Sequence, residues 1–222
     1  MALYVDCAYL ADITAVARII PLAGVTTNPT ILLNAYGHGQ NLEPQVLLQR
    51  LLQELNGTIF MQPSMRDEES AYHEARSYIE SEPERVLPKI PMTQMGMRVA
   101  LRLRAEGQRV AFTAVTTVTQ AYTAALAGAE FIIPYYNRLQ RSGVDASERV
   151  AQMAELLHNQ HLATRILAAS IKSPAEAAEA LSAGAHDLTV PPQVLLEMVS
   201  DPESEEAVTK FELDWQKLKN AH

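Results

Sequence analysis

Cysteine, tryptophan and lysine are scarce in this chain. The shortage of cysteine and the shortage of lysine each exclude some classes of protein. The single cysteine, Cys7, excludes an internal disulfide, which fits a reducing compartment. The formal net charge is −8 and no lysine-rich run is present, which argues against nucleic acid and acidic membranes as partners. Residues 1–6 lack a basic n-region and a long apolar h-region, and no stretch approaches a transmembrane span. We therefore expect a cytoplasmic protein.

The spacing of apolar residues predicts strands and helices in strict alternation along the whole chain. Runs typical of strands lie at 2–6, 21–26, 57–62, 85–90, 108–114, 129–135, 162–169 and 185–190. Amphipathic helical segments lie at 8–19, 42–55, 66–81, 94–106, 116–127, 146–160, 173–183 and 192–200. This order favours a closed (β/α)8 TIM barrel, an α/β fold, over an open doubly wound sheet. We assign residues 1–200 to one barrel domain with catalytic function.

The last segment, 201–222, is predicted to add one more helix after the barrel. Its helical pattern runs over about 203–220, with acidic residues early and lysines late, as the helix dipole favours. Its apolar side chains exceed what a solvated tail needs; they are Val208, Phe211, Leu213, Trp215 and Leu218. We expect this helix to dock on the barrel or on a neighbouring subunit.

Lys89 is the most informative residue, because it is the only lysine before Lys172 while thirteen arginines occupy the same stretch. Arginine stays protonated, whereas a desolvated lysine amine can lose its proton and attack a carbonyl. The flanking segment 86–92 reads as a short, apolar, buried strand, and a buried ammonium pairs or lowers its pKa. The alternative is an edge-strand lysine whose stem packs while its amine reaches water. These residues alone leave both interpretations open.

Polar residues stand at or near the carboxyl ends of seven predicted strands, where barrel enzymes collect their chemistry. In chain order they are Asp6, Thr26 to Asn28, Gln62, Lys89, Thr113, Tyr135 to Arg138, and Ser170 with Lys172. A single residue of this kind is usually a helix cap or a turn former. Their gathering around an isolated lysine favours a catalytic rim.

Such a rim contains what an imine-forming aldolase needs. Lys89 would attack a ketone and expel water, which gives a Schiff base that accepts electrons from the neighbouring C–C bond. Asp6 and Tyr135 are the candidates to move the substrate hydroxyl proton. Gln62 and Thr113 could hold the water that shuttles that proton. A phosphate could bind Arg138, Ser170 and Lys172, with the helix N-terminus at Ser173-Pro174 adding its dipole; these residues complete the predicted site.

Several segments resemble the transaldolase family. The segment Gly24-Val25-Thr26-Thr27-Asn28-Pro29-Thr30 resembles the N-terminal signature of that family, and Lys89-Ile90-Pro91-Met92-Thr93, followed by Gly96, resembles its Schiff-base lysine segment. The likeness continues through Ala125 to Glu130, Pro134 to Arg138, Leu167 to Lys172 and Phe211 to Gln216. It covers essentially the whole chain.

Within the family, a few positions favour the fructose-6-phosphate aldolase branch over transaldolase proper. Aldolases carry glutamine and tyrosine where transaldolases carry glutamate and phenylalanine, and this chain has Gln62 and Tyr135. Transaldolases also hold the donor with polar side chains at the positions of Ala111 and Ile133, both apolar here. The runner-up is a transaldolase that passes a dihydroxyacetone unit between sugar phosphates. A non-catalytic sugar-phosphate-binding barrel is the second alternative.

The resemblance also implies roles for the site residues. It makes Lys89 the Schiff-base former and lets Gln62, Thr113 and Tyr135 position a water, with Tyr135 as acid and base. Contact with the donor sugar, or support of the lysine, falls to Asp6, Thr26, Asn28 and Ser170, and contact with the acceptor phosphate falls to Arg138 and Lys172. The family implies a homo-oligomer, a pentamer or decamer in which the last helix packs on a neighbour. No metal or organic cofactor is expected.

Three departures from the family pattern bear on specificity. Pro88 precedes the lysine where relatives usually have an aliphatic residue, and it removes a ladder donor. Phe112 stands where glycine is common, and Ile133 is bulkier than the alanine expected in the aldolase branch. We expect Ile133 to narrow the donor pocket, and we expect the three changes to leave the chemistry intact but to alter the choice of donor.

Overall fold

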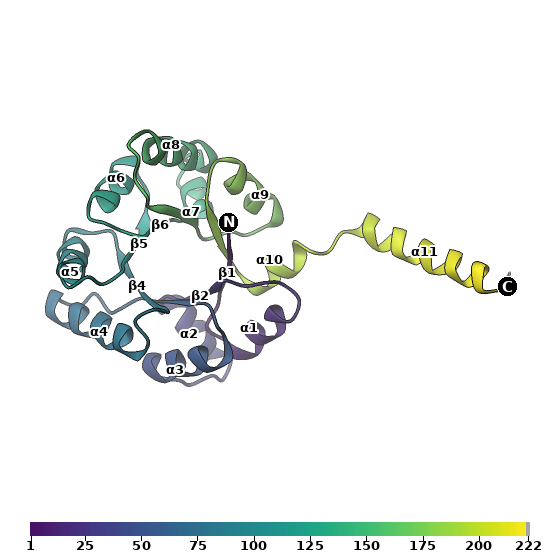
Figure 1. Cartoon of the computed structure of the whole chain (residues 1–222), viewed down its shortest axis with the longest axis horizontal. Helices are drawn as coiled ribbons and strands as arrows, with labels where there is room; N and C mark the ends of the chain where they lie inside the picture. Colours follow the sequence, from purple (N-terminus) through teal and green to yellow (C-terminus); the bar gives the residue numbers. More distant parts are fainter. Residues whose placement is uncertain (221–222) are drawn as a thin grey trace.

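A closed barrel of eight parallel strands forms the centre of the molecule (Figure 1) in the computed structural model, which describes residues 1–220. The strands follow one another around the barrel in chain order, and the last pairs with the first. They are β1 (Leu3–Asp6), β2 (Gly24–Thr26), β3 (Thr58–Met61), β4 (Val86–Pro91), β5 (Ala111–Val115), β6 (Phe131–Pro134), β7 (Arg165–Ala168) and β8 (Asp187–Val190). The predicted TIM barrel is confirmed.

Helices surround the barrel and cover its outer face, except for the last one, α11, which extends away from it (Figure 1). They are α1 (Leu10–Ala17), α2 (Pro29–Gly37), α3 (Pro44–Glu54), α4 (Glu68–Ser81), α5 (Gln94–Ala105), α6 (Val118–Leu126), α7 (Tyr136–Arg141), α8 (Ala146–Asn159), α9 (Pro174–Ser182), α10 (Pro192–Glu197) and α11 (Pro202–Asn220). Two of them, α2 and α7, were not predicted. Both begin within a few residues of a strand end, so they lie close to the carboxyl end of the barrel.

The interior of the barrel is filled by inward-facing side chains. This inner cluster consists of Tyr4, Phe60, Leu87, Ala111, Phe131, Ile133, Leu167 and Ala169. The Phe60 ring packs edge-on against Tyr4 and Phe131, with centroids 5.3 and 5.4 Å apart. Because side chains alternate along a strand, the residues two positions further on point the same way. The polar groups Asp6 and Lys89 therefore rise from this apolar floor into the carboxyl-end mouth.

Ion pairs tie the strands together at the opposite, amino-terminal end. Arg165 on β7 holds the buried Asp187 of β8 with two hydrogen bonds of 2.7 Å. Arg109, just before β5, holds Glu130, just before β6, with hydrogen bonds of 2.6 and 2.8 Å. Paired guanidinium–carboxylate contacts of this kind fix geometry strongly. This end of the barrel is therefore built for stability, as expected for TIM barrels.

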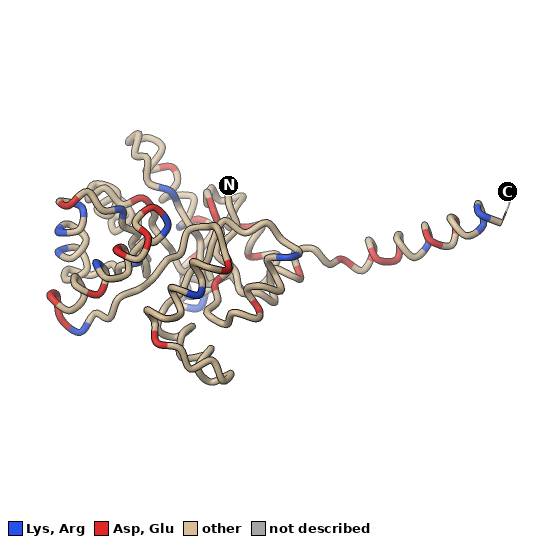
Figure 2. The backbone as a smooth tube through the Cα atoms, turned by 60° about the horizontal axis from the view of Figure 1, so that its bottom comes forward, with Lys and Arg blue, Asp and Glu red and all other residues tan. Residues whose placement is uncertain are grey.

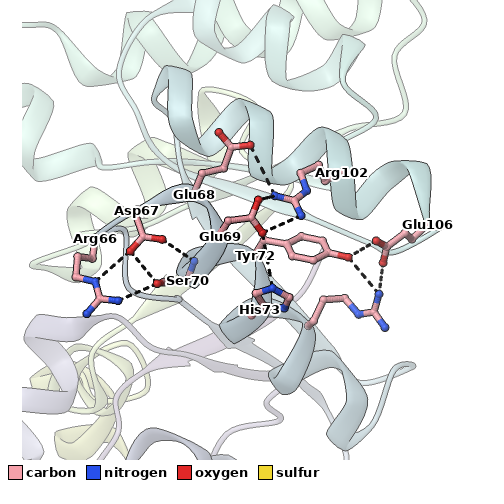
Figure 3. Close-up of polar contacts among 10 residues, drawn as sticks. Arg66, Asp67, Glu68, Glu69, Ser70, Tyr72, His73, Arg102 and Glu106 are labelled. Carbon is pink, nitrogen blue, oxygen red and sulfur yellow. Dashed lines mark hydrogen bonds and ion pairs between the residues drawn. The ribbon is translucent and has the colours of Figure 1, made fainter.

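A second polar network joins α4 to α5, the two helices that pack beside β4 (Figure 3). The Arg102 guanidinium donates to Glu69 at 2.7 Å and lies 3.9 Å from the centroid of the Tyr72 ring. The Tyr72 hydroxyl and Arg76 both donate to Glu106, at the end of α5. Exposed pairs contribute little singly, but a connected network fixes the relative position of two helices. Here it braces the helices that support the strand of Lys89.

The last helix, α11, extends away from the barrel in both views (Figures 1 and 2). None of its residues is buried, and its apolar side chains at Val208, Phe211, Leu213, Trp215 and Leu218 are each more than half exposed. Acidic residues gather at its start and lysines at its end, as the sequence predicted (Figure 2). The docking of this helix stays a prediction, and residues 221 and 222 of the predicted segment lie outside the described range.

Among residues 1–220, no helix combines the length and the apolar character that crossing a bilayer requires.

Candidate active site

A cavity of about 460 Å³ opens at the carboxyl ends of the strands. It is lined by every predicted site residue except Thr26, namely Asp6, Asn28, Gln62, Lys89, Thr113, Tyr135, Arg138, Ser170 and Lys172. These side chains come from segments spread over most of the sequence. The parallel barrel brings them together because its strands all end at the same mouth.

Lys89 reaches this cavity from inside the barrel, on β4. The residue is only 2% exposed, and its amine has neither a hydrogen-bond partner nor an ion-pair partner within the described chain. Burial lowers the pKa of the amine below its ordinary value, while the nearby charge of Asp6 opposes that shift. The edge-strand alternative does not describe this lysine, because β4 pairs on both sides and the amine faces the cavity.

Pro88 fits into β4 without disturbing the barrel. The β3–β4 pairing ends at Pro88, and the β4–β5 pairing begins at Lys89. The proline therefore stands where the strand changes neighbours, at the least demanding point for a missing donor.

Asp6 faces Lys89 from β1 and is held from below by Thr26. The Thr26 hydroxyl lies 2.6 Å from Asp6 Oδ1, and the threonine itself is fully buried. Burial raises the pKa of the Asp6 carboxyl, and the charge of Lys89 together with the Thr26 hydrogen bond opposes that shift. Thr26 thus lies behind the carboxylate and does not line the cavity.

Tyr135 and Thr113 form a hydroxyl pair on the far side of the cavity. The Thr113 hydroxyl donates to the Tyr135 hydroxyl at 2.9 Å. Burial raises the pKa of the Tyr135 phenol, so the phenol stays protonated at neutral pH. A protonated phenol beside a lysine can donate a proton and later take it back.

Two residues at the mouth, Ala114 and Ser170, have left-handed backbone conformations. Their φ angles are 58° and 61°, values that L-residues other than glycine adopt at a cost. At Ala114 the β5–β6 register shifts between Thr113 and Val115, which is the mark of a bulge. Both residues line the cavity. The strained turns redirect the chain at the site itself.

The phosphate-binding candidates lie on α7 and in the turn before α9. Arg138 belongs to α7, and its guanidinium carbon lies 4.6 Å from the centroid of the Tyr135 ring. Lys172 is exposed, and its backbone N–H donates to the Glu176 carboxylate at 2.8 Å. An acid, Glu176, therefore already occupies the start of α9 and offsets the helix dipole there.

Residues that the sequence did not single out also belong to the site. Ile31 and Asn34 line the cavity from α2, whose N-cap is Asn28 with its Oδ1 accepting from the Ile31 N–H at 3.0 Å. The pair Asn28-Pro29 is a helix-start signature that could have revealed this helix. Thr189 lies inside β8 and bonds to Thr26. Its signal was a polar residue within an apolar strand.

Structural comparison shows that the fold is shared with proteins of little sequence similarity. A designed cube-shaped, highly porous protein cage, made by fusing symmetric oligomeric domains, matches with a TM-score of 0.61 and 14% identity, over 100% of this chain and 78% of that chain. A mandelate oxidase variant matches with a TM-score of 0.59 and 14% identity, over 87% of this chain and 65% of its own. FabK from Thermotoga maritima matches with a TM-score of 0.56 and 15% identity, over 86% of this chain and 57% of its own. At these identities the likeness shows the fold alone.

The sequence itself matches one family model almost from end to end. The Transaldolase/Fructose-6-phosphate aldolase model covers residues 3–222, which include every lining residue of the cavity. The chain therefore belongs to the transaldolase/fructose-6-phosphate aldolase family, whose members act as aldolases or transaldolases.

Proposed function

We propose that this protein is a class I aldolase that reversibly cleaves fructose 6-phosphate, or a similar ketose phosphate, into dihydroxyacetone and glyceraldehyde 3-phosphate. The observation that carries the proposal is the Lys89 amine, buried, without a partner in the described chain, and facing a cavity beside Asp6. Lowering the pKa of an amine increases its neutral fraction, and the neutral amine is the form that attacks a carbonyl.

The first half of the reaction ends in C–C cleavage. The neutral Lys89 amine adds to the C2 carbonyl of the ketose, and loss of water gives a protonated imine. A base removes the proton of the C4 hydroxyl, the C3–C4 bond breaks, and glyceraldehyde 3-phosphate leaves as an aldehyde. The electron pair of the broken bond passes into the imine, which becomes an enamine. Asp6 and Tyr135 both line the cavity and are the candidates to exchange that proton.

The second half releases dihydroxyacetone. The enamine takes a proton at C3, water adds to C2 of the resulting imine, and the C–N bond breaks to return the free amine. The Tyr135 phenol, kept protonated by burial and bonded to Thr113, is suited to deliver and recover the proton. Gln62 lines the same cavity and can hold the water that carries the proton between Tyr135 and the enamine.

Binding contacts follow from the charges at the mouth. The cations Arg138 and Lys172, with the Ser170 hydroxyl, are suited to the phosphate of the acceptor aldehyde. Asn28 lines the same cavity, and because its oxygen is used to cap α2, its amide N–H groups remain for donor hydroxyls.

A transaldolase is the second candidate, because the family includes both activities. It would use the same enamine but pass the three-carbon unit to a second sugar phosphate before water intervenes. Gln62 and Tyr135 favour cleavage, since both can order a water at the imine. The buried apolar Ala111 and Ile133 support the same choice, because they offer the donor no polar contact.

Reduction of the imine tests the proposal. The protein is treated with borohydride in the presence of dihydroxyacetone, and intact mass followed by peptide mapping locates the adduct. We expect one adduct per chain, on Lys89, in the wild type and in Lys172→Met, and none in Lys89→Met. A wild type that forms no adduct would defeat both enzymatic readings and leave a non-catalytic sugar-phosphate-binding barrel. Release of free dihydroxyacetone from fructose 6-phosphate then separates aldolase from transaldolase.

A further inference from the structure

Three polar residues on adjacent strands form a hydrogen-bonded chain inside the barrel. Asp6 on β1 and Thr26 on β2 are direct neighbours in register, and Thr189 stands on β8, at the other side of β1. The Thr26 hydroxyl lies 2.6 Å from the Asp6 carboxylate and 2.5 Å from the Thr189 hydroxyl. Both threonines are fully buried. Thr26 therefore links the Asp6 carboxylate to a residue that does not reach the cavity.

When Asp6 is ionised, the number of available protons determines which group donates in each of these hydrogen bonds. An ionised carboxylate only accepts, and a threonine hydroxyl has one proton to donate. The Thr26 proton therefore goes to Asp6. The short contact between the two threonine oxygens then requires the Thr189 proton, which has no other partner among residues 1–220. The order is Thr189 to Thr26 to Asp6, and each donor polarises the next.

We propose that Thr189 is a positioning residue for the Asp6 carboxylate, which it holds ionised and oriented by donating its proton to Thr26. The inference deepens the proposed function and rests on it, since Asp6 matters through its action on Lys89 and the substrate. Thr189 does not line the cavity, and among residues 1–220 its hydroxyl bonds only to Thr26, so its route to the carboxylate runs through Thr26.

The groups around Asp6 explain why its hydrogen bond with Thr26 matters. Lys89 faces the carboxylate from β4, Tyr135 from the end of β6, Lys172 from the turn after β7, and Cys7 follows it in sequence. None of these side chains makes a hydrogen bond to Asp6 in the described chain, and Thr26 makes the one that is present. Burial works against the charged form here, so strengthening or weakening that single hydrogen bond changes the balance directly.

Titration of the Asp6 carboxyl is the measurement that tests the proposal, because it does not depend on turnover. The protein is labelled with [4-¹³C]aspartate, and the Asp6 resonance is identified by its absence in Asp6→Asn. In Thr189→Val, which removes the hydroxyl but keeps the shape, we expect the midpoint to rise by about half a pH unit or more. In Thr189→Ser, which keeps the hydroxyl, it stays at the wild-type value.

Thr164→Val is the matched control for loss of a buried threonine hydroxyl. Thr164 is buried near the opposite end of β7, where its hydroxyl donates to the Ala129 carbonyl at 2.7 Å. We expect it to lower thermal stability without moving the Asp6 midpoint. A wild-type midpoint in Thr189→Val, or a raised one in Thr189→Ser, would overturn the proposal.

Imine trapping with dihydroxyacetone across the pH range gives the second readout. Its profile moves in Thr189→Val in step with the Asp6 midpoint if the proposed function holds. If the wild type forms no imine, the proposed function fails, while the carboxyl titration still decides the role of Thr189.

Discussion

Arg138 lies over the ring of Tyr135, with its guanidinium carbon 4.6 Å from the ring centroid. The contact joins Arg138, the proposed phosphate contact on α7, to Tyr135, the proposed acid and base, which is the N-cap of the same helix. A cation over an aromatic face is attractive, and phosphate bound by Arg138 changes the charge above that ring. We therefore expect phosphate recognition and proton transfer to be coupled on this side of the cavity.

The first prediction separates the two cations that face the acceptor. Lys172→Met is expected to raise KM for glyceraldehyde 3-phosphate by about 10- to 100-fold, the effect of one lost charge-assisted contact, with little change in kcat. Arg138→Met is expected to raise KM similarly and also to lower kcat, because it removes the cation above Tyr135. Steady-state synthesis from dihydroxyacetone measures both. Arg141→Met, exposed on the same helix, serves as control. Equal losses with unphosphorylated glyceraldehyde would contradict the assignment.

The second prediction concerns the hydroxyl of Tyr135. Tyr135→Phe removes the proton that returns to the enamine, so release of free dihydroxyacetone is expected to fall by about 100-fold or more. Transfer of the three-carbon unit to erythrose 4-phosphate is expected to persist or increase, because the enamine survives longer. Tyr136→Phe is the matched control: it also deletes a phenol hydroxyl, here bonded to Glu179 at 3.1 Å on the outer side. Equal loss of both activities in Tyr135→Phe would argue against this role.

The third prediction is a pH dependence set by the pair Asp6 and Lys89. Imine formation needs the neutral amine, so its rate rises with pH through the pKa of Lys89, which burial holds below the ordinary lysine value. The negative charge of Asp6 raises that pKa, and its removal therefore lowers it further. In Asp6→Asn the rising limb of borohydride trapping should move to lower pH.

Asp12→Asn, which neutralises an exposed aspartate on α1, provides the control for this profile. Its rising limb should coincide with that of the wild type. A limb that moved to higher pH in Asp6→Asn would mean that Asp6 does not act on Lys89 through its charge.

The fourth prediction concerns the first turn of α5, where the helix meets the end of β4. A Cβ added at Gly96 would lie 2.0 Å from the Pro91 carbonyl oxygen, so Gly96→Ala forces the backbone apart next to the lysine strand. We expect a loss of about 1–3 kcal/mol in the free energy of unfolding, together with slower imine trapping. Denaturant melts measure the first effect. Gly37→Ala is the control, because a Cβ there meets nothing within 4 Å. An unchanged midpoint in Gly96→Ala would show that the turn yields easily.

The fifth prediction concerns the exposed apolar residues of α11. Val208, Phe211, Trp215 and Leu218 recur at helical spacing, so they share one face of a helix that has no buried residue. We propose that this face docks on a neighbouring subunit, as the family resemblance implies. Phe211→Glu with Trp215→Glu is expected to lower the mass measured by light scattering. Glu212→Gln on the same helix is the control. An unchanged mass in the double variant would remove the helix from the interface.

The barrel was predictable because its strands and helices differ in hydrophobic period. The predicted strand limits were too wide at several amino-terminal sides: the run at 21–26 becomes β2 (Gly24–Thr26), and 108–114 becomes β5 (Ala111–Val115). Apolar residues such as Val110 are buried before the strand begins, so hydrophobicity alone does not mark its start. The helices α2 and α7 were missed because each is short and follows a strand end that reads as a turn.

The site was predictable to the extent that its residues stand at the ends of strands. Lys89 stands out because arginine replaces lysine nearly everywhere else before Lys172. Thr189 was missed because it lies within β8, where only the geometry of the closed barrel brings it to Thr26. The position of Thr26 behind Asp6 depends on the same closure, which no local pattern reports.

The ion pairs of Arg165 with Asp187 and of Arg109 with Glu130 lie at the amino-terminal end of the barrel, remote from Lys89. The contacts that stabilise the fold and the residues of the candidate site therefore lie at opposite ends of the barrel. The cavity at the carboxyl end can therefore be redesigned for another aldehyde without changing the ion pairs at the amino-terminal end. Heat tolerance, conversely, can be improved by reinforcing that end, far from the Lys89 amine to which we assign the chemistry.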